Sequence, residues 1–316
     1  MPTSPRSEAR TRSWLGPYIG ITLSWGGSFM FIKLALSAFT PFGVVFLSSA
    51  TGTLVMLGIA RARHVTLPRG RRLWLKLWVM ALSISAAPGI LTAVAESHAS
   101  SSFVGVVLSG LIPLMSLFFI AVVFREESIS PSRLVGFALG VIGVMIMFGI
   151  WQGIGHNLWW AVVAVIGAST LVGFSYPFSR RHLLGLGIDP IALAGTQLIL
   201  TTLTLLPAFL IDGRSSHDLP GKAVLGVVCL GVFANGLAYM WNFQVIHAAG
   251  SSVASTVNFL SPAVAIVCGI TLLHERLTWY EPIGGVIILL GVAIGQGRLA
   301  RPSKATAPPA LRSTRS

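Results

Sequence analysis

The chain has 316 residues, of which 54% are hydrophobic and only 10% are charged, and its mean hydropathy is +0.81. A soluble domain carries roughly 25% charged residues, and no soluble fold of this length can hide so much apolar surface, so the composition excludes a soluble protein and indicates an integral membrane protein. The formal charge of +13 does not indicate nucleic-acid binding, because the basic residues lie in short clusters between apolar runs, as orientation signals of membrane proteins do.

Apolar segments long enough to cross a bilayer, which needs roughly 20 residues, follow one another along the chain. Polar residues, Pro and Gly separate ten such segments, each predicted to be a transmembrane helix: 15–37, 41–60, 73–95, 100–124, 132–150, 157–178, 190–211, 220–243, 251–273 and 279–298. Residues 1–14 are predicted to be a cytoplasmic segment, and residues 299–316 a disordered cytoplasmic tail. Ser130 and Asp189, each followed by a proline, are expected as helix N-caps.

The basic residues predict the orientation of these spans. With the N-terminus in the cytoplasm, 18 of the 22 Lys and Arg residues fall on the cytoplasmic side. Arg214, Lys222 and Arg276 fall outside, and Lys33 lies within the first span. The positive-inside rule therefore places both termini in the cytoplasm.

The two halves of the chain resemble each other in sequence. Residues 102–113 (SFVGVVLSGLIP) align with residues 251–262 (SSVASTVNFLSP) at an offset of 149. The same offset pairs His98 with His247. The chain is therefore predicted to contain an internal repeat.

The repeat predicts an architecture. Past Pro113 the offset falls to 148, where Glu127 pairs with Glu275, so we expect a bulge or a changed helix end between Pro113 and Glu127. The repeats, 15–150 and 157–298, hold five spans each, and an odd number makes the second enter the membrane from the opposite side. The predicted fold is an all-α membrane protein of ten transmembrane helices in two inverted five-helix repeats, which is typical of secondary transporters.

Several motifs carry a family resemblance: SWGGSFMFIK (24–33), AAGSSVAST (248–256) and HERLTWYEPIGG (274–285), with earlier copies SSFVGVVLSGLIP and REESISPSRLVG. Over about residues 14–298 the chain resembles the drug/metabolite transporter superfamily, of the ten-helix EamA type. The resemblance implies a secondary transporter, and in direction an exporter, that moves small metabolites, amino-acid-like solutes or drugs across the plasma membrane by alternating access. Glu96 and His98 depart from the family, which more usually has neutral residues there.

Neutral polar side chains in the middle of the spans are the candidate substrate-binding residues. They are Trp25, Ser28, Tyr176, Asn235, Tyr239, Asn242 and Asn258. The spacing of Asn235, Tyr239 and Asn242 places them on one helical face, which lines a cavity or makes interhelical hydrogen bonds. Aromatic rings with amides suit a small amphipathic or zwitterionic solute.

Ionisable residues near the ends of the spans are the candidates for gating or coupling. They are Lys33, Glu96, His98, His247, Glu127 and Glu275. Lys33 either snorkels to the interface, contacts a substrate carboxylate or pairs with Glu96. Glu127 and Glu275 each precede a helix, so they cap its N-terminus or form a gate. No acid lies at a midplane, so proton antiport, exchange and facilitated diffusion stay open.

The fifth and tenth spans each carry a face of small residues, at Gly136–Gly140 and Gly291–Gly295. These faces are expected either to pack against other helices of the chain or to form a homodimer contact. The alternative functions are a membrane-embedded lipid-modifying enzyme and a non-transporting scaffold. The histidines are scattered, with no pair spaced by four residues, and no phosphate-binding loop is present. We therefore expect no enzyme activity, cofactor or metal, and as partners a small-molecule substrate and the lipid bilayer.

Overall fold

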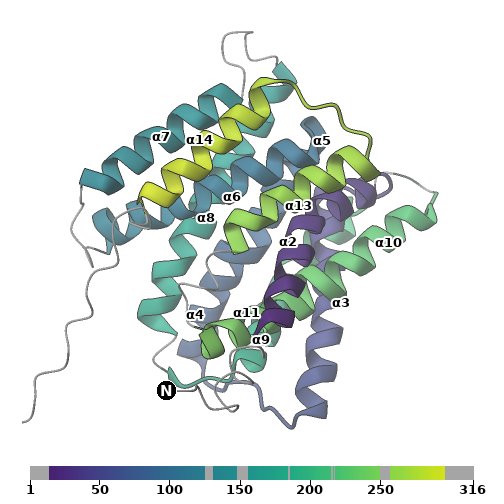
Figure 1. Cartoon of the computed structure of the whole chain (residues 1–316). Helices are drawn as coiled ribbons and strands as arrows, with labels where there is room; N and C mark the ends of the chain where they lie inside the picture. The colour runs from purple at the N-terminus through teal and green to yellow at the C-terminus, as the bar shows by residue number, and fades with distance from the viewer. Residues whose placement is uncertain are drawn as a thin grey trace, which may run out of the picture.

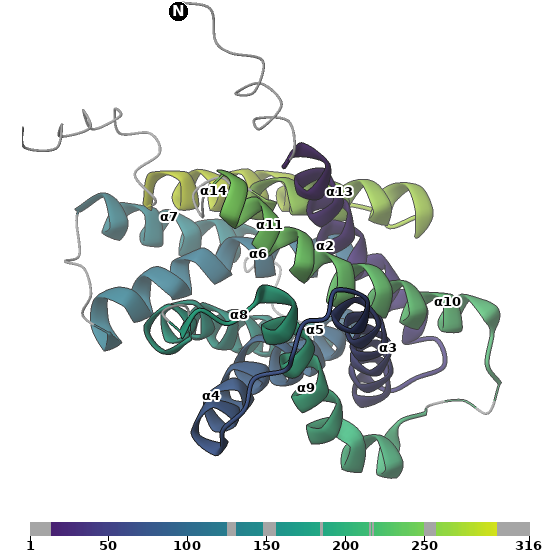
Figure 2. The same cartoon turned by 90° about the horizontal axis from the view of Figure 1, so that it is seen from below.

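The computed structural model describes residues 14–124, 131–147, 156–183, 186–214, 216, 218–249 and 257–295. Within these residues the regular structure is helical, apart from one isolated antiparallel bridge between Phe39 and Arg214. The helices pack into a single bundle (Figure 1, Figure 2).

The helices follow the predicted segments closely. The first half of the chain forms α2 (Leu15–Ala35), α3 (Pro41–Ala62), α4 (Arg71–Ala81), η1 (Leu82–Ala86), α5 (Ala87–His98), α6 (Ser101–Phe118), η2 (Phe119–Val123) and α7 (Pro131–Met147). The second half forms α8 (His156–His182), α9 (Pro190–Asp212), α10 (Gly221–Cys229), η5 (Leu230–Leu237), α11 (Ala238–Ala249), α13 (Val257–Leu272) and α14 (Tyr280–Gly295). The η elements are π-helical turns that make α4–η1–α5, α6–η2 and α10–η5–α11 continuous. Helix occupies part or all of every predicted span.

The N-caps of α3 and α9 lie at equivalent positions of the two halves, 149 residues apart. The Thr40 hydroxyl accepts a hydrogen bond from the Gly43 amide at 3.2 Å. The Asp189 carboxylate accepts one from the Ile191 amide at 2.7 Å. The prediction of Asp189 as an N-cap is confirmed, whereas Ser130 lies outside the described residues.

Two further features recur at the same offset. The hydroxyls of Thr53 in α3 and Thr202 in α9, which are 149 residues apart, lie 3.3 Å from each other. The π-helical turn η1 in the third span corresponds to residues 231–235, which fall within η5 in the eighth span. The repeat found in the sequence therefore extends to helix caps and helix irregularities.

The extra residue of the first half is absorbed in a π-helical turn. Helix α6 passes into η2, which lies between Pro113 and Glu127, whereas its counterpart α13 continues as α-helix to Leu272. A π-helical turn accommodates one additional residue within an otherwise regular helix. The bulge expected there is confirmed.

Helices α7 and α14 lie side by side (Figure 1, Figure 2) and approach closely through glycines. A Cβ atom on Gly143 would lie 2.8 Å from the Gly284 carbonyl oxygen, and one on Gly291 would lie 2.7 Å from that of Gly136. In the alignment of the two halves, Gly143 corresponds to Gly291 and Gly136 to Gly284. Each helix therefore makes the same glycine contact with the other, as two copies related by a two-fold axis do. These glycines therefore serve packing within the chain, and a homodimer through the fifth and tenth spans stays a prediction.

Contacts at one end of the bundle join helix starts to helix ends. At the start of α3, the Thr40 hydroxyl donates to the carbonyl of Asp212, where α9 ends. Nearby, the Ser216 amide donates to the Ala38 carbonyl at 3.3 Å. Helix α2 ends here and α6 begins here, so we name it the Lys33 end, after the lysine in the last turn of α2.

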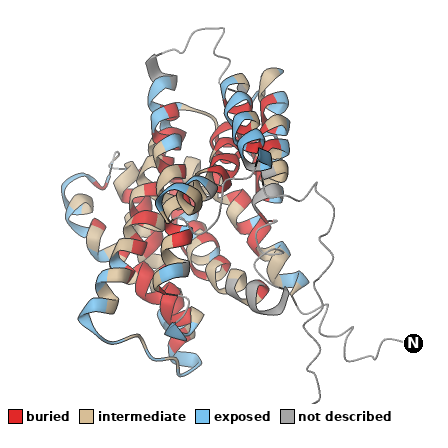
Figure 3. Cartoon of the chain, turned by 90° about the vertical axis from the view of Figure 1, so that its left-hand side faces the viewer, coloured by how far each residue is buried: buried red, intermediate tan, exposed pale blue. Residues whose placement is uncertain are grey.

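The outer surface of the bundle is apolar. Leucines exposed on it include Leu54 at 72% and Leu203 at 58%, while buried residues gather between the helices (Figure 3). Six helical segments of the described chain are long and apolar enough to cross a membrane: Pro41–Ala62, Arg71–His98, Ser101–Val123, Trp159–Ser179, Pro190–Asp212 and Gly221–Asn242. Shorter apolar helices cover Leu134–Ile146, Leu260–Leu272 and Tyr280–Gly291. The chain is a multi-pass membrane protein, and the number of ten spans stays a prediction.

Candidate functional site

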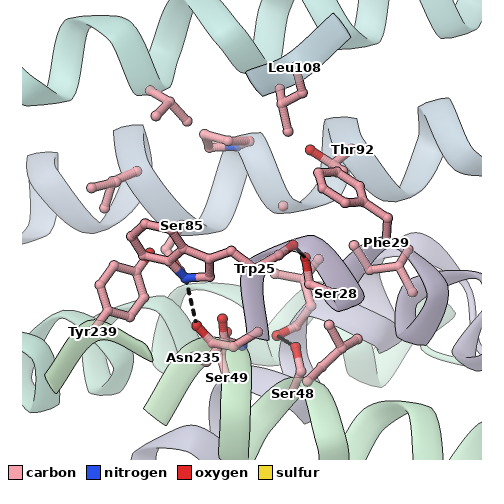
Figure 4. A pocket seen from close by; sticks show the side chains of 18 of the residues that line it. Trp25, Ser28, Phe29, Ser48, Ser49, Ser85, Thr92, Leu108, Asn235 and Tyr239 are labelled. Atoms are coloured by element: carbon pink, nitrogen blue, oxygen red, sulfur yellow. Dashed lines mark hydrogen bonds between the residues drawn. The ribbon is translucent and has the colours of Figure 1, made fainter. Parts of the chain in front are cut away.

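A cavity of about 230 Å³ lies between helices of both halves of the chain (Figure 4). Its walls come from α2, α3, η1, α5, α6, α8, η5, α11 and α13. The lining side chains with polar atoms are Trp25, Ser28, Ser48, Ser49, Ser85, Thr92, Ser109, Tyr176, Asn235, Tyr239 and Ser261. The described lining residues carry no formal charge, so this cavity offers hydrogen bonds and aromatic surface to a solute.

Five of the seven predicted substrate-binding residues line this cavity: Trp25, Ser28, Tyr176, Asn235 and Tyr239. Asn242 is not among the lining residues. The side chain of Asn258 lies outside the described part of the chain. The π-helical turn η5 includes Asn235 and ends before Tyr239, and both of these residues line the cavity, so the turn does not account for the position of Asn242.

Trp25 and Tyr239 form an aromatic wall between the two halves. Their rings meet edge to face, with centroids 6.0 Å apart and planes inclined by 71°. The Trp25 indole N–H donates to the Ala234 carbonyl, within η5, at 3.3 Å. On α2, the Ser28 hydroxyl donates to the Trp25 carbonyl at 2.7 Å. The wall is therefore held by contacts across the two halves as well as along α2.

The sequence did not single out the hydroxyl groups of Ser48, Ser49, Ser85, Thr92, Ser109 and Ser261 as lining residues. The hydroxyls of Ser49 and Ser261 are buried and have no hydrogen-bond partner among the described residues. Gln197, which the sequence analysis also did not single out, is buried, and its Nε2 atom has no hydrogen-bond partner among the described residues. The only sequence signal for such lining residues is an isolated polar residue in an apolar span. This signal is weak, because a hydroxyl often bonds to a carbonyl of its own helix, as Ser83 does to Val79.

Lys33 and Glu96 come together beside the cavity, at the Lys33 end. The Lys33 ammonium donates to the backbone carbonyls of Glu96 at 2.6 Å and Ala99 at 2.9 Å. These carbonyls lie in the last turn and C-cap of α5, where a positive charge is favoured. Lys33 is therefore held by the backbone around Glu96.

Glu275 joins the same cluster from the segment after α13. Its carboxylate accepts hydrogen bonds from the amides of Ser101 at 2.7 Å and Ser102 at 3.1 Å, and from the Ser102 hydroxyl at 2.7 Å. It therefore caps α6, in the other half of the chain. The interpretation that Glu275 caps the following helix, α14, is wrong, because the carboxylate binds the free amides in the first turn of α6. Before α14, it is Glu281 that accepts a hydrogen bond, from the Thr278 amide.

Of the remaining gating candidates, only His98 has a described side chain, and it does not contact this cluster. His98 is exposed, and its Nδ1 atom lies 2.8 Å from the Ser97 hydroxyl and 2.9 Å from the Val94 carbonyl. The side chain of His247 and the whole of Glu127 lie outside the described residues. Across the described ranges no three His, Cys, Asp or Glu side chains are grouped as ligands for a metal ion.

The apolar outer surface and the helical bundle place the chain in the class of multi-pass membrane proteins, and its central cavity is lined by uncharged residues. The model of the EamA-like transporter family matches residues 14–149 and 159–294. The chain belongs to this family and is a membrane transporter, and the resemblance carried by its motifs is confirmed.

Relatives over most of the chain bear transporter names. A protein of Archaeoglobus fulgidus named an uncharacterized transporter is 25% identical, over 85% of this chain and 92% of the relative. The uncharacterized inner membrane transporter YedA of Escherichia coli K12 is 25% identical, over 94% of this chain and 95% of its own length. A solved crystal structure with 19% sequence identity superposes with a TM-score of 0.65 and covers 92% of this chain and 99% of its own, so it shares the fold.

Proposed function

We propose that the chain is a secondary transporter that moves small amphipathic or zwitterionic solutes through the central cavity by alternating access. The observation that carries this proposal is the wall formed by Trp25 and Tyr239, which come from different halves of the chain and meet at the cavity. A site between two halves changes its access when the halves rock against each other. Small metabolites, amino-acid-like solutes and drugs are the substrate class.

The two halves are proposed to be inverted repeats. Helices α3 and α9 are equivalent, and the Thr40–Asp212 contact places the start of one beside the end of the other. Helices α6 and α13 are also equivalent, and Glu275, just after the end of α13, binds the first amides of α6. Equivalent helices that run in opposite directions support an inverted pair. The reciprocal glycine contacts of α7 and α14 support it as well.

The distribution of charge supports the proposed orientation. Arg61, Arg63, Arg69 and Arg71 lie around the loop between α3 and α4, at the opposite end from Lys33. By the positive-inside rule this opposite end faces the cytoplasm, together with both termini, and the Lys33 end faces outward. The inner-membrane name of the YedA relative supports a plasma-membrane location. Export is the proposed direction, from the family resemblance.

The lining chemistry supports a solute without strong net charge. Indole, phenol, amide and hydroxyl groups supply aromatic surface and hydrogen bonds. Ligand sites of this kind combine apolar walls with a few placed polar groups. The transporter names of the relatives favour a carrier over the two alternatives, a membrane-embedded lipid-modifying enzyme and a non-transporting scaffold.

The experiment is counterflow in proteoliposomes without a pH gradient. Vesicles loaded with one unlabelled compound from a panel of neutral amino acids and uncharged aromatic drugs receive the same compound in labelled form outside. A carrier of that compound gives a transient, saturable accumulation of label. Absence of counterflow across the panel, with correctly folded protein, contradicts the proposal.

Substitutions in the aromatic wall test the site. At solute concentrations well below half-saturation, Trp25→Ala and Tyr239→Ala are each expected to lower the initial counterflow rate about tenfold or more, equivalent to about 1.4 kcal/mol of lost binding. The matched control is Trp159→Ala on α8, where the indole is 51% exposed on the outer surface. Wild-type rates in both wall variants would remove this cavity as the site.

A further inference from the structure

Glu96 is a buried acid whose hydrogen bonding is incomplete. The side chain is 0% exposed, and its Oε2 atom accepts a hydrogen bond from the Ser101 hydroxyl at 2.8 Å. Its Oε1 atom has no hydrogen-bond partner among the described residues. A buried ionised carboxylate is costly unless charges and hydrogen bonds around it compensate.

The charges around Glu96 do not balance. Among the residues that the structure describes, the charged groups that face it are Lys33, on α2, and Glu275, from the segment after α13. Ser101 links the two acids, because its hydroxyl donates to Glu96 and its amide donates to Glu275. Two carboxylates against one ammonium leave one negative charge in the cluster, and one bound proton removes it.

A positive charge already lies beside Glu96. The Lys33 ammonium donates to the carbonyls of Glu96 and Ala99, so a metal cation bound at Glu96 would lie close to this charge and be repelled by it. A proton needs only one carboxylate oxygen. The cluster therefore suits a proton better than a metal ion.

We propose that Glu96 binds the proton that couples solute movement to the proton gradient. This step rests on the proposed transport function. The site adjoins the cavity directly: Thr92, one helical turn earlier on α5, lines the cavity, and so does Phe29 on α2. The proton site and the solute site therefore share parts of the same two helices.

Ser101 connects the proton to the cavity wall. Its hydroxyl lies 2.8 Å from Glu96 Oε2 and 3.3 Å from the Phe29 carbonyl, so both acceptors are within reach. When Glu96 is ionised, Ser101 donates to the carboxylate. When a proton from solvent converts the carboxylate to the acid, the new O–H donates to the Ser101 oxygen, and the serine proton turns to Phe29. Protonation thus reverses the hydrogen bond between Glu96 of α5 and Ser101 of α6 and adds a hydrogen bond from Ser101 to Phe29 of α2.

The test is infrared difference spectroscopy of the full chain in proteoliposomes, with the proton as probe. Acidification should produce a carbonyl band of a buried carboxylic acid. This band should be absent in Glu96→Gln, shifted in frequency in Ser101→Ala, which changes the hydrogen bond to the acid, and unchanged in the control Glu281→Gln. A wild-type spectrum without the band, or a band unaffected by both the Glu96 and Ser101 substitutions, overturns the proton site.

The coupling is tested with any compound that shows counterflow. A pH gradient should change wild-type and Glu281→Gln uptake, and should not change Glu96→Gln uptake. If the gradient leaves wild-type uptake unchanged, coupling is overturned while the carrier stands. The infrared band without counterflow of any compound leaves the proton site standing and removes the carrier, so the two failures are distinguishable.

Discussion

Glu96 in α5 and Val245 in α11 occupy equivalent positions in the two halves of the chain, 149 residues apart, and both are 0% exposed. Glu96 lies in a polar cluster with Lys33 and Glu275. Val245 packs in an apolar cluster with Ile21 and Val257. The halves therefore share helices, caps and π-helical turns, while an ionisable group is buried in only one of these two matched places. The features that the halves share form the walls of the cavity. The buried acid, which only the first half has at this position, places an ionisable cluster at the Lys33 end of the bundle.

The largest effect is expected when this difference is reversed. Val245→Glu places a carboxyl group among apolar side chains, and burying it without partners costs about 3 kcal/mol or more. Little folded protein should be recovered in detergent, as judged by size-exclusion chromatography and thermal melting. Val245→Ala is the control, because it removes valine packing without adding charge.

The opposite substitution is expected to be mild for the fold. Glu96→Val removes an oxygen that has no partner, and Ser101 can still donate to the Phe29 carbonyl. The charged groups that remain, Lys33 and Glu275, are one base and one acid, so Glu96→Val leaves no uncompensated charge in the cluster, and a melting temperature near that of the wild type is expected. Equal damage from Val245→Glu and Glu96→Val would show that the two sites do not differ as described.

The shared contact of α7 and α14 gives the next effect. Gly143→Leu and Gly291→Leu each drive a side chain against backbone of the opposite helix, and overpacking costs about 1–3 kcal/mol. Because the contact is reciprocal, the two variants should lower the melting temperature by similar amounts. Gly58→Leu is the control, since a Cβ atom there meets nothing within 4 Å. Wild-type melting of either variant would contradict the close approach.

The sequence predicted features that depend on local pattern. Helix positions followed from apolar length, the Asp189 cap from its residue type before a proline, and the η2 bulge from the one-residue change of offset. Each of these is decided within one helix or by comparison of two segments. The membrane-protein class and the family likewise followed from composition and motifs.

Features that depend on contacts between distant segments were not predictable in the same way. Glu275 binds amides 173 and 174 residues away, and the sequence pointed only to the adjacent helix. Asn242 was grouped with Tyr239 by α-helical spacing, and both lie in α11, yet only Tyr239 lines the cavity. The full burial of Glu96 depends on α2 and α6 packing over the end of α5, so its distance from a span end did not reveal it.

A smaller effect than at the glycine contact is expected at the matched caps of α3 and α9. Asp189→Ala removes a hydrogen bond of 2.7 Å to the Ile191 amide, and Thr40→Ala removes one of 3.2 Å from the Gly43 amide. Loss of an N-cap costs about 1 kcal/mol. Thr40 also ties α3 to the Asp212 carbonyl, so Thr40→Ala should cost as much as Asp189→Ala despite its longer cap bond.

The two caps are separated by conservative variants. Asp189→Asn keeps a side-chain acceptor and should recover most of the melting temperature, because Asn caps as well as Asp. Thr40→Ser keeps the hydroxyl for both of its bonds and should do the same. Asp218→Ala, at an exposed acid, is the control for loss of a surface charge. If Asp189→Ala melts like Asp218→Ala, the cap of α9 contributes nothing, and the halves are matched there in geometry without being matched in energy.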